Sequence, residues 1–91
     1  MFAEVLKELD TEQTHIIVRK EFRKFQKPST IIQGLKNNKE ELERIMHELK
    51  RKLAAGGTVK DGVIIIQGDH RDKIKQILTS LGYSSNNIEV Q

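Results

Sequence analysis

The spacing of apolar residues along the chain predicts two amphipathic helices. The first has one apolar face, formed by Leu42, Ile45, Met46, Leu49 and Leu53. Asn38 suits the N-cap position, Glu41 completes a capping box, and Gly56-Gly57 is expected to end this helix. The second helix has an inner face formed by Ile74, Ile77, Leu78 and Leu81. We expect Asp69 to cap it and Gly82 to end it.

Segments rich in β-branched residues predict the strands. The first two are expected at 14–22 and 29–33, joined by a turn that ends at Pro28. Two more flank Asp61-Gly62, a strong signal for a two-residue hairpin turn. The segment after this turn, 63–67, is apolar almost throughout, which is typical of a central strand that is buried on both faces or flanked by neighbours. A last strand is expected at 86–90.

The resulting order is β-β-α-β-β-α-β, and it predicts an α/β fold. Because each helix is apolar on one side only, we expect a two-layer α/β sandwich with both helices on one face of the sheet. The helical connections allow parallel crossovers, so the sheet of about five strands is expected to be mixed. We assign residues 14–91 to this single domain and residues 1–13 to an N-terminal extension. A short helix is indicated in the extension by Phe2, Val5, Leu6 and Leu9.

Positive charge is concentrated in residues 19–27, on the first predicted hairpin. This segment carries five basic side chains and one acidic one, a net of +4, whereas the whole chain has a net charge of +3. Such a concentration favours contact with phosphates, although a solvated lysine-rich hairpin explains the same charge. The basic residues here are Arg19, Lys20, Arg23, Lys24 and Lys27.

A second basic group closes the first helix and consists of Lys50, Arg51 and Lys52. The helix dipole alone accounts for cations at this place, so a binding role is one of two readings. Lys36, in the loop that enters the helix, is expected to extend the same surface.

Two aromatic residues interleave with the basic hairpin. An exposed aromatic ring can stack on a nucleobase. Alternation along the strand places Phe22 on one face with Ile16 and Val18, so we expect Phe22 in the core. Phe25 lies near the tip, where base stacking and capping of the hairpin are both open.

The sequence argues against several function classes. It contains no cysteine, which excludes disulfides, thiolate zinc sites and cysteine nucleophiles and favours the cytoplasm. No apolar run approaches the ~18 residues of a membrane span, and the start of the chain lacks the pattern of a signal peptide. No two histidines are spaced as metal ligands, and the glycines form no nucleotide-binding loop. We therefore expect no catalytic site, metal or cofactor.

Three segments carry a resemblance that covers about His15 to Val90. They read Thr30-Ile31-Ile32-Gln33-Gly34-Leu35, Gly56-Gly57-Thr58-Val59-Lys60-Asp61-Gly62, and Ile64-Ile65-Ile66-Gln67-Gly68-Asp69-His70-Arg71. Together they closely resemble the translation initiation factor 1 family. The tight turn at Asp61-Gly62 is similar to archaeal members, since eukaryotic members carry a longer loop there.

The resemblance implies a small factor that binds the small ribosomal subunit near the P site. There it would promote accurate start-codon and initiator-tRNA selection by disfavouring mismatched pairing. The implied partners are 16S-type rRNA, initiator tRNA, the start-codon region of mRNA and other initiation factors, with the protein acting as a monomer and not at a membrane.

The resemblance also implies roles for particular residues. The basic hairpin would reach RNA through Arg23, Lys24, Gln26 and Lys27, and the helix end would face rRNA through Lys50, Arg51 and Lys52. Charge and position add Arg19, Lys20, Phe25 and Lys36 to the expected RNA-binding surface. The fidelity motif of the family would be Gln67, Gly68, Asp69, His70 and Arg71.

Three alternatives stay open on the sequence alone. A general ribosome- or RNA-binding regulator on the same fold would bind ribosomes and leave start-site choice unchanged. A nuclease would lose turnover when one of its histidines is changed. A protein-interaction module would dock a partner through the apolar face of the N-terminal segment, and this role is compatible with initiation.

Overall fold

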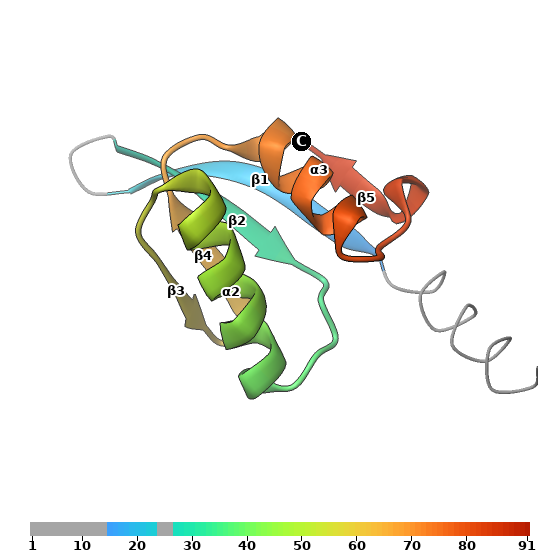
Figure 1. Ribbon diagram of the computed structural model, residues 1–91. Coiled ribbons are helices and arrows are strands. Elements are labelled where there is room, and N and C mark those ends of the chain that lie inside the picture. The colour runs from blue at the N-terminus through green and yellow to red at the C-terminus, as the bar shows by residue number, and fades with distance from the viewer. Residues whose placement is uncertain (1–14, 24–26) are drawn as a thin grey trace, which may run out of the picture.

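The computed structural model describes residues 15–23 and 27–91, shown in Figure 1. Its elements are β1 (Ile16–Arg23), β2 (Lys27–Gln33), α2 (Lys39–Leu53), β3 (Gly57–Lys60), β4 (Val63–Gln67), α3 (Arg71–Ser80), the short 3-10 helix η2 (Ser85–Asn87) and β5 (Ile88–Val90). The helix predicted within residues 1–13 and the turn residues Lys24, Phe25 and Gln26 lie outside the described residues, so those interpretations stay predictions.

Within the described residues, five strands form one mixed sheet. The strand order is β3-β4-β2-β1-β5; the β1–β5 pair is parallel and the other neighbours are antiparallel. Both helices lie on one side of this sheet, as Figure 1 shows, with α2 against β3 and β4 and α3 against β1 and β5. The predicted two-layer α/β sandwich is therefore confirmed.

The core lies between the sheet and the two helices. Alternate residues of each strand face the helices, and several of their side chains are fully buried, among them Val18, Ile32 and Ile64. The helices contribute Leu42, Met46, Leu49, Ile74 and Leu78. These are among the positions whose helical spacing predicted an inner face, but the prediction for Leu81 is wrong, because Leu81 follows the last residue of α3 and is 42% exposed.

The start of α2 agrees with the prediction from the sequence, whereas its end does not. The Asn38 side chain accepts a hydrogen bond of 2.8 Å from the Glu41 backbone N–H, which confirms the predicted cap. The Glu41 carboxylate accepts a hydrogen bond from the Asn37 side-chain amide. The expected end at Gly56-Gly57 is wrong, because Ala54 already adopts the left-handed conformation (φ 52°) and its N–H bonds to the Lys50 carbonyl.

The turn between β3 and β4 is the predicted two-residue hairpin. Asp61 and Gly62 have φ values of 53° and 78°, so both central residues are left-handed. This combination is the type I′ geometry, whose twist matches that of the flanking strands.

Phe22 is not in the core, and that prediction is wrong. Its side chain faces the same way as Ile16 and Val18, yet it is 61% exposed. The reason is the register of the strands, because the last β2–β4 pair joins Ser29 to Gln67. Phe22 pairs with Pro28 beyond that point, where β1 and β2 continue as a two-stranded stem past the helices (Figure 1).

Among the residues that the structure describes, no helix combines the length and the apolar character that crossing a membrane requires.

Candidate nucleic-acid interface

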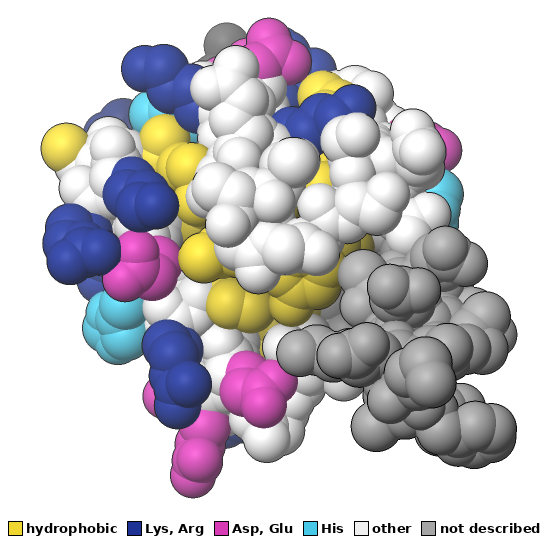
Figure 2. All heavy atoms as spheres, turned by 45° about the vertical axis from the view of Figure 1, so that its right-hand side comes forward, with side chains coloured by type: hydrophobic (Ala, Val, Ile, Leu, Met, Phe, Trp, Pro, Cys, Tyr) yellow, Lys and Arg dark blue, Asp and Glu magenta, His cyan; other side chains and the backbone are white. Residues whose placement is uncertain are grey.

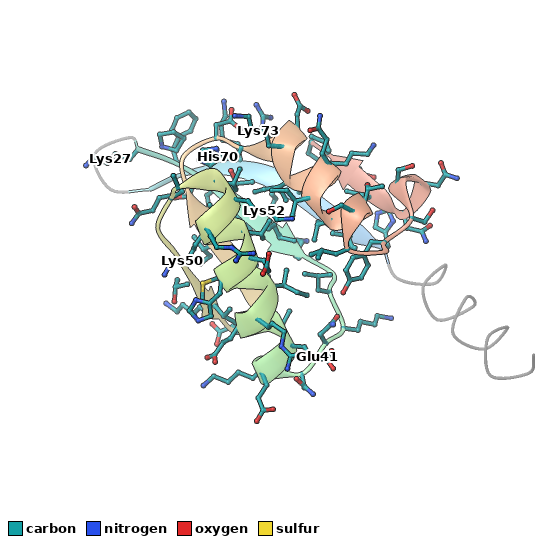
Figure 3. The ribbon with its side chains drawn as sticks, viewed as in Figure 1. Lys27, Glu41, Lys50, Lys52, His70 and Lys73 are labelled. Carbon is teal, nitrogen blue, oxygen red and sulfur yellow. The ribbon has the colours of Figure 1, made fainter. Side chains whose placement is uncertain are left out.

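The predicted RNA-binding hairpin has a two-stranded part that the structure describes, residues 20–23 and 27–29. We call this part the hairpin stem. Its strands pair Glu21 with Ser29, Phe22 with Pro28, and Arg23 with Lys27. Lys20 and Lys27 are exposed, and Figure 3 shows Lys27 near the outer end of the stem. The stem therefore carries its cations away from the body of the protein.

Arg19 differs from these stem cations because its guanidinium is engaged within the protein. Its Nε donates to the Gln33 side chain at 3.0 Å, and its Nη1 donates to the Glu21 carboxylate at 3.2 Å. Alternation places Arg19 on the sheet face opposite the helices. The structure thus separates Arg19 from Lys20, which faces the helical side.

The basic end of α2 does not present its three cations equally. Arg51 is held by Glu48, whose two carboxylate oxygens each accept from Nη2 at 2.8 Å. The Lys50 side chain is half-buried and its methylene groups pass close to Gly57, whereas Lys52 is exposed. Lys36 lies at the opposite end of α2, about 20 Å of helix away, so it does not extend this surface.

The segment 67–71 is fastened to the base of the hairpin stem. Thr30 is fully buried, and its hydroxyl donates to the Gly68 carbonyl at 2.6 Å while accepting from the His70 N–H at 3.0 Å. The Gly68 N–H donates to the Pro28 carbonyl at 2.9 Å. One buried hydroxyl and one backbone bond therefore fix how this segment meets the stem.

Gly68 is required by its own backbone and by its neighbour. Its φ of +95° lies in the region that favours glycine, and an added Cβ would lie 2.6 Å from His70 Nε2. That ring nitrogen lies 3.0 Å from the Gln67 carbonyl oxygen, to which it donates when it carries the proton. The tight loop thus folds the imidazole back over the glycine.

Asp69 is paired with Arg71 and does not cap α3, so the predicted cap is wrong. His70 is the N-cap residue, and its side chain makes no capping hydrogen bond. Arg71 Nε and Nη2 donate to the two Asp69 carboxylate oxygens at 2.8 and 3.0 Å. These hydrogen bonds are the main reason that the pKa of Asp69 lies below its usual value, and the same pairing raises the pKa of Arg71.

Arg71 also ties the motif to the end of β5. Its Nη1 donates to the Gln91 carbonyl at 2.6 Å, and the Gln91 N–H donates to the Val18 carbonyl at 2.9 Å. The guanidinium therefore bridges the segment before α3 and the strand next to β1.

Several of the candidate residues that the structure describes lie toward one end of the molecule, whereas Lys36 does not. In Figure 3, Lys27, His70, Lys73 and Lys52 lie toward the same end, and Glu41 lies at the opposite end. Sequence reasoning missed Lys73, which is exposed in the first turn of α3. The sequence did contain a sign of it, because a lysine in the first turn of a helix is unusual. The helix dipole disfavours positive charge at that place.

The face seen in Figure 2 also carries several separate Lys and Arg side chains around an apolar area.

No group of three metal-binding side chains gathers within residues 15–23 and 27–91. In these residues the geometry offers cations, a fixed loop and an exposed ring, which suit binding.

Comparison with known proteins shows which family the chain resembles. The family described as Translation initiation factor SUI1 matches residues 12–84. A protein translation factor SUI1 homolog of Thermococcus gammatolerans is 50% identical over 91 residues, covering 100% of this chain and 89% of that protein. Homologs of the same name from Nitrosopumilus maritimus and Sulfolobus acidocaldarius are 49% and 45% identical, covering 91% and 96% of this chain and 81% and 88% of those proteins.

These relatives are archaeal, which agrees with the archaeal character expected from the tight Asp61-Gly62 turn. The family match spans β1 to α3 and so includes both the hairpin stem and the segment 67–71. The chain belongs to the SUI1 family of translation initiation factors.

Proposed function

We propose that this protein binds the small ribosomal subunit near the P site and promotes accurate start-codon and initiator-tRNA selection by disfavouring mismatched pairing. It acts in the cytoplasm as a monomer, together with other initiation factors. Membership of the family supports this role. The observation that carries it is the gathering of the stem cations, the segment 67–71 and the end of α2 at one end of the fold.

In this proposal the basic residues bind and position the factor. The hairpin contributes Arg19, Lys20, Arg23, Lys24, Phe25, Gln26 and Lys27 toward 16S-type rRNA, initiator tRNA and the start-codon region of mRNA. The end of α2 contributes Lys50, Arg51 and Lys52 toward rRNA. Contacts of this kind fix orientation through phosphates and carry little sequence information.

Discrimination follows from occupancy and needs no bond chemistry. A hairpin that occupies part of the space into which the tRNA must move adds a fixed free-energy cost to full binding of the tRNA in the P site. Correct codon pairing offsets that cost, whereas a mismatched pair does not. A coupling of ~1–3 kcal/mol would give roughly 5- to 150-fold discrimination. The fidelity residues Gln67 to Arg71 act here by holding the stem at a fixed angle, through Thr30 and Pro28.

The experiment is co-sedimentation with purified archaeal small ribosomal subunits, with large subunits as the control. We expect saturable binding to the small subunit that weakens steeply with salt, because neutralised phosphates release counterions. The variant Arg23→Ala/Lys24→Ala/Lys27→Ala should bind more weakly and show a flatter salt dependence.

A matched control loses the same charge at the opposite end of the molecule. The variant Lys36→Ala/Lys39→Ala/Arg44→Ala removes three exposed cations around the start of α2 and should leave binding nearly unchanged. Equal losses in the two variants would mean that net charge, and not the hairpin, drives binding.

Start-site choice is the second measurement, and it separates the proposed factor from a general ribosome-binding regulator. In reconstituted initiation, the protein should lower the occupancy of near-cognate start codons more than that of AUG. Binding to the small subunit without this effect would overturn the fidelity role.

A further inference from the structure

Phe22 is a large apolar side chain that is 61% exposed. Among the described residues, the other large hydrophobic side chain with substantial exposure is Leu81, at 42%. The Lys20 ammonium lies over the Phe22 ring, 5.1 Å from its centroid. An aromatic ring has two faces, and one cation occupies only one of them.

Phe22 lines a cleft where the hairpin stem leaves the sheet. The cleft has a volume of about 910 Å³ and extends from Phe22 and Pro28 along the β3–β4 hairpin to Thr58, Lys60 and Gln67. We call it the stem cleft. It is larger than the hollow of about 550 Å³ beside Asp69 and Arg71. Its size falls within the range of small-molecule and nucleotide sites.

The stem cleft combines three kinds of group. Phe22, Pro28 and Ile65 provide apolar surface. Lys27 and Lys60 provide exposed cations, which suit phosphate oxygens. Glu21 also lines the cleft, and its carboxylate is paired with Arg19 at 3.2 Å, which reduces its repulsion of an anion.

Polar groups capable of reading a base edge complete the wall. Thr58 and Gln67 are exposed at the cleft, and within the described part of the chain neither side chain makes a hydrogen bond. A hydroxyl and an amide can each donate and accept, so they can pair with the edge of more than one base.

We propose that the stem cleft binds an unpaired nucleotide of single-stranded RNA, with its base stacked on Phe22 and its flanking phosphates near Lys27 and Lys60. Base–aromatic stacking beside cations is the common way in which proteins hold single strands. A protein segment fits less well, because a docked apolar side chain would desolvate both lysines without giving them a partner. The inference goes beyond the proposed function, because it names a direct base contact that charge alone does not provide.

The first test uses Phe22→Trp in the full chain. The protein contains no tryptophan, so the introduced indole is the only one and reports on the cleft. We expect saturable quenching of its fluorescence by a short unstructured oligoribonucleotide. An abasic oligomer with the same number of phosphates should quench little. Equal quenching by both oligomers, or quenching by neither, would overturn the proposal.

The second test measures oligoribonucleotide affinity for unlabelled variants. Phe22→Ala should weaken binding at least about fivefold, the lower end of what removal of one stacked ring costs. Phe22→Tyr should restore most of the affinity, since it keeps the ring. Leu81→Ala is the matched control, because it removes another exposed apolar side chain away from the cleft, and it should leave affinity unchanged.

The same variants on the small subunit separate this inference from the proposed function. Loss of oligonucleotide binding in Phe22→Ala, with the wild-type protein failing to bind the subunit, would support the cleft and overturn the proposed function. Normal oligonucleotide binding in Phe22→Ala would overturn the cleft alone. If Phe22→Ala weakened binding only to the intact subunit, Phe22 would contact the subunit in another way, and the assignment of the stem cleft to single-stranded RNA would be wrong.

Discussion

The strands β1 and β2 serve two purposes along their length, and Val18 and Phe22 show the difference. Both side chains lie on the same side of the same strand, yet Val18 is fully buried and Phe22 is 61% exposed. In the body, β2 is paired on both sides and helices cover the inner face; in the stem, β1 and β2 pair only with each other. The alternation along the strand therefore determines which face of the sheet a side chain lies on. Whether that side chain is buried depends on whether a helix covers the sheet at that point.

Thr30 marks the boundary between these two regions. It pairs with Lys20 in β1 and with Ile66 in β4, and it is the first residue along β2 whose helix-facing side chain is buried. Its hydroxyl holds Gly68 and His70. One polar side chain thus holds the segment 67–71 at the place where the apolar packing ends. On one side of this boundary the strands are covered by packed helices, and on the other side they form the exposed hairpin stem.

The largest expected difference in the free energy of unfolding is between a substitution in the helix-covered part of the sheet and one in the hairpin stem. Ile32→Ala should lower the free energy of unfolding by about 2–5 kcal/mol, because it leaves a cavity among fully buried neighbours. Phe22→Ala should change it by no more than ~0.5 kcal/mol, as expected of an exposed position. Chemical denaturation of both variants checks this, and similar losses would show that the stem is part of the core.

The next effect tests the boundary itself. Thr30→Val should cost about 1–3 kcal/mol, since the Gly68 carbonyl and the His70 N–H lose a buried partner. Thr58→Val is the control, because Thr58 is exposed in β3 and makes no hydrogen bond with its side chain in the described residues. Thermal unfolding would distinguish them, and equal melting temperatures would contradict the role assigned to Thr30.

A smaller effect is expected at the start of α2, far from the stem. Asn38→Ala should destabilise the protein by ~1 kcal/mol, because the Glu41 N–H loses its cap. Asn38→Asp keeps an acceptor at this place and should remain close to the wild type in denaturant unfolding. If subunit binding fell along with stability in Asn38→Ala, the separation between body and stem would be incomplete.

The smallest effect concerns the pH dependence of the Asp69–Arg71 pair. The pKa of Asp69 is below its usual 3.8 in the folded protein, so the carboxylate favours the folded state. This contribution is present above the usual pKa and is lost as the pH falls through the lowered value. Asp69→Asn should remove this part of the acid dependence. The pair is partly exposed, so its contribution is small, and NMR titration of the Asp69 carboxyl is the direct check.

Sequence patterns predicted features that depend on neighbouring residues. The Asn38 cap and the Asp61-Gly62 turn are determined by local hydrogen bonding and backbone conformation, and both are found. The mixed sheet with helices on one face followed from the order of elements and their one-sided apolar faces. These predictions needed no knowledge of how far one strand extends past another.

The features that were missed depend on distant partners. Phe22 is exposed because β4 ends opposite Ser29, and no pattern within β1 contains that information. Asp69 was expected to cap α3, but Arg71 offers its carboxylate two charged donors, which form stronger hydrogen bonds than backbone N–H groups. The candidate site was therefore predicted as a set of residue types, whereas its fastening by Thr30 and its stem cleft emerged only from the fold.

The parallel pairing of β1 with β5 has a consequence for how the protein is made. Ile16 lies beside Ile88, so the first and the last of the described strands are neighbours, and every other element lies between them in the chain. During synthesis, β1 can pair early with β2, but its other edge has no strand to pair with until β5 emerges. Closing so long a loop costs entropy and slows folding. The outer edge of β1 is thus open to wrong partners for most of the time that translation of this domain takes.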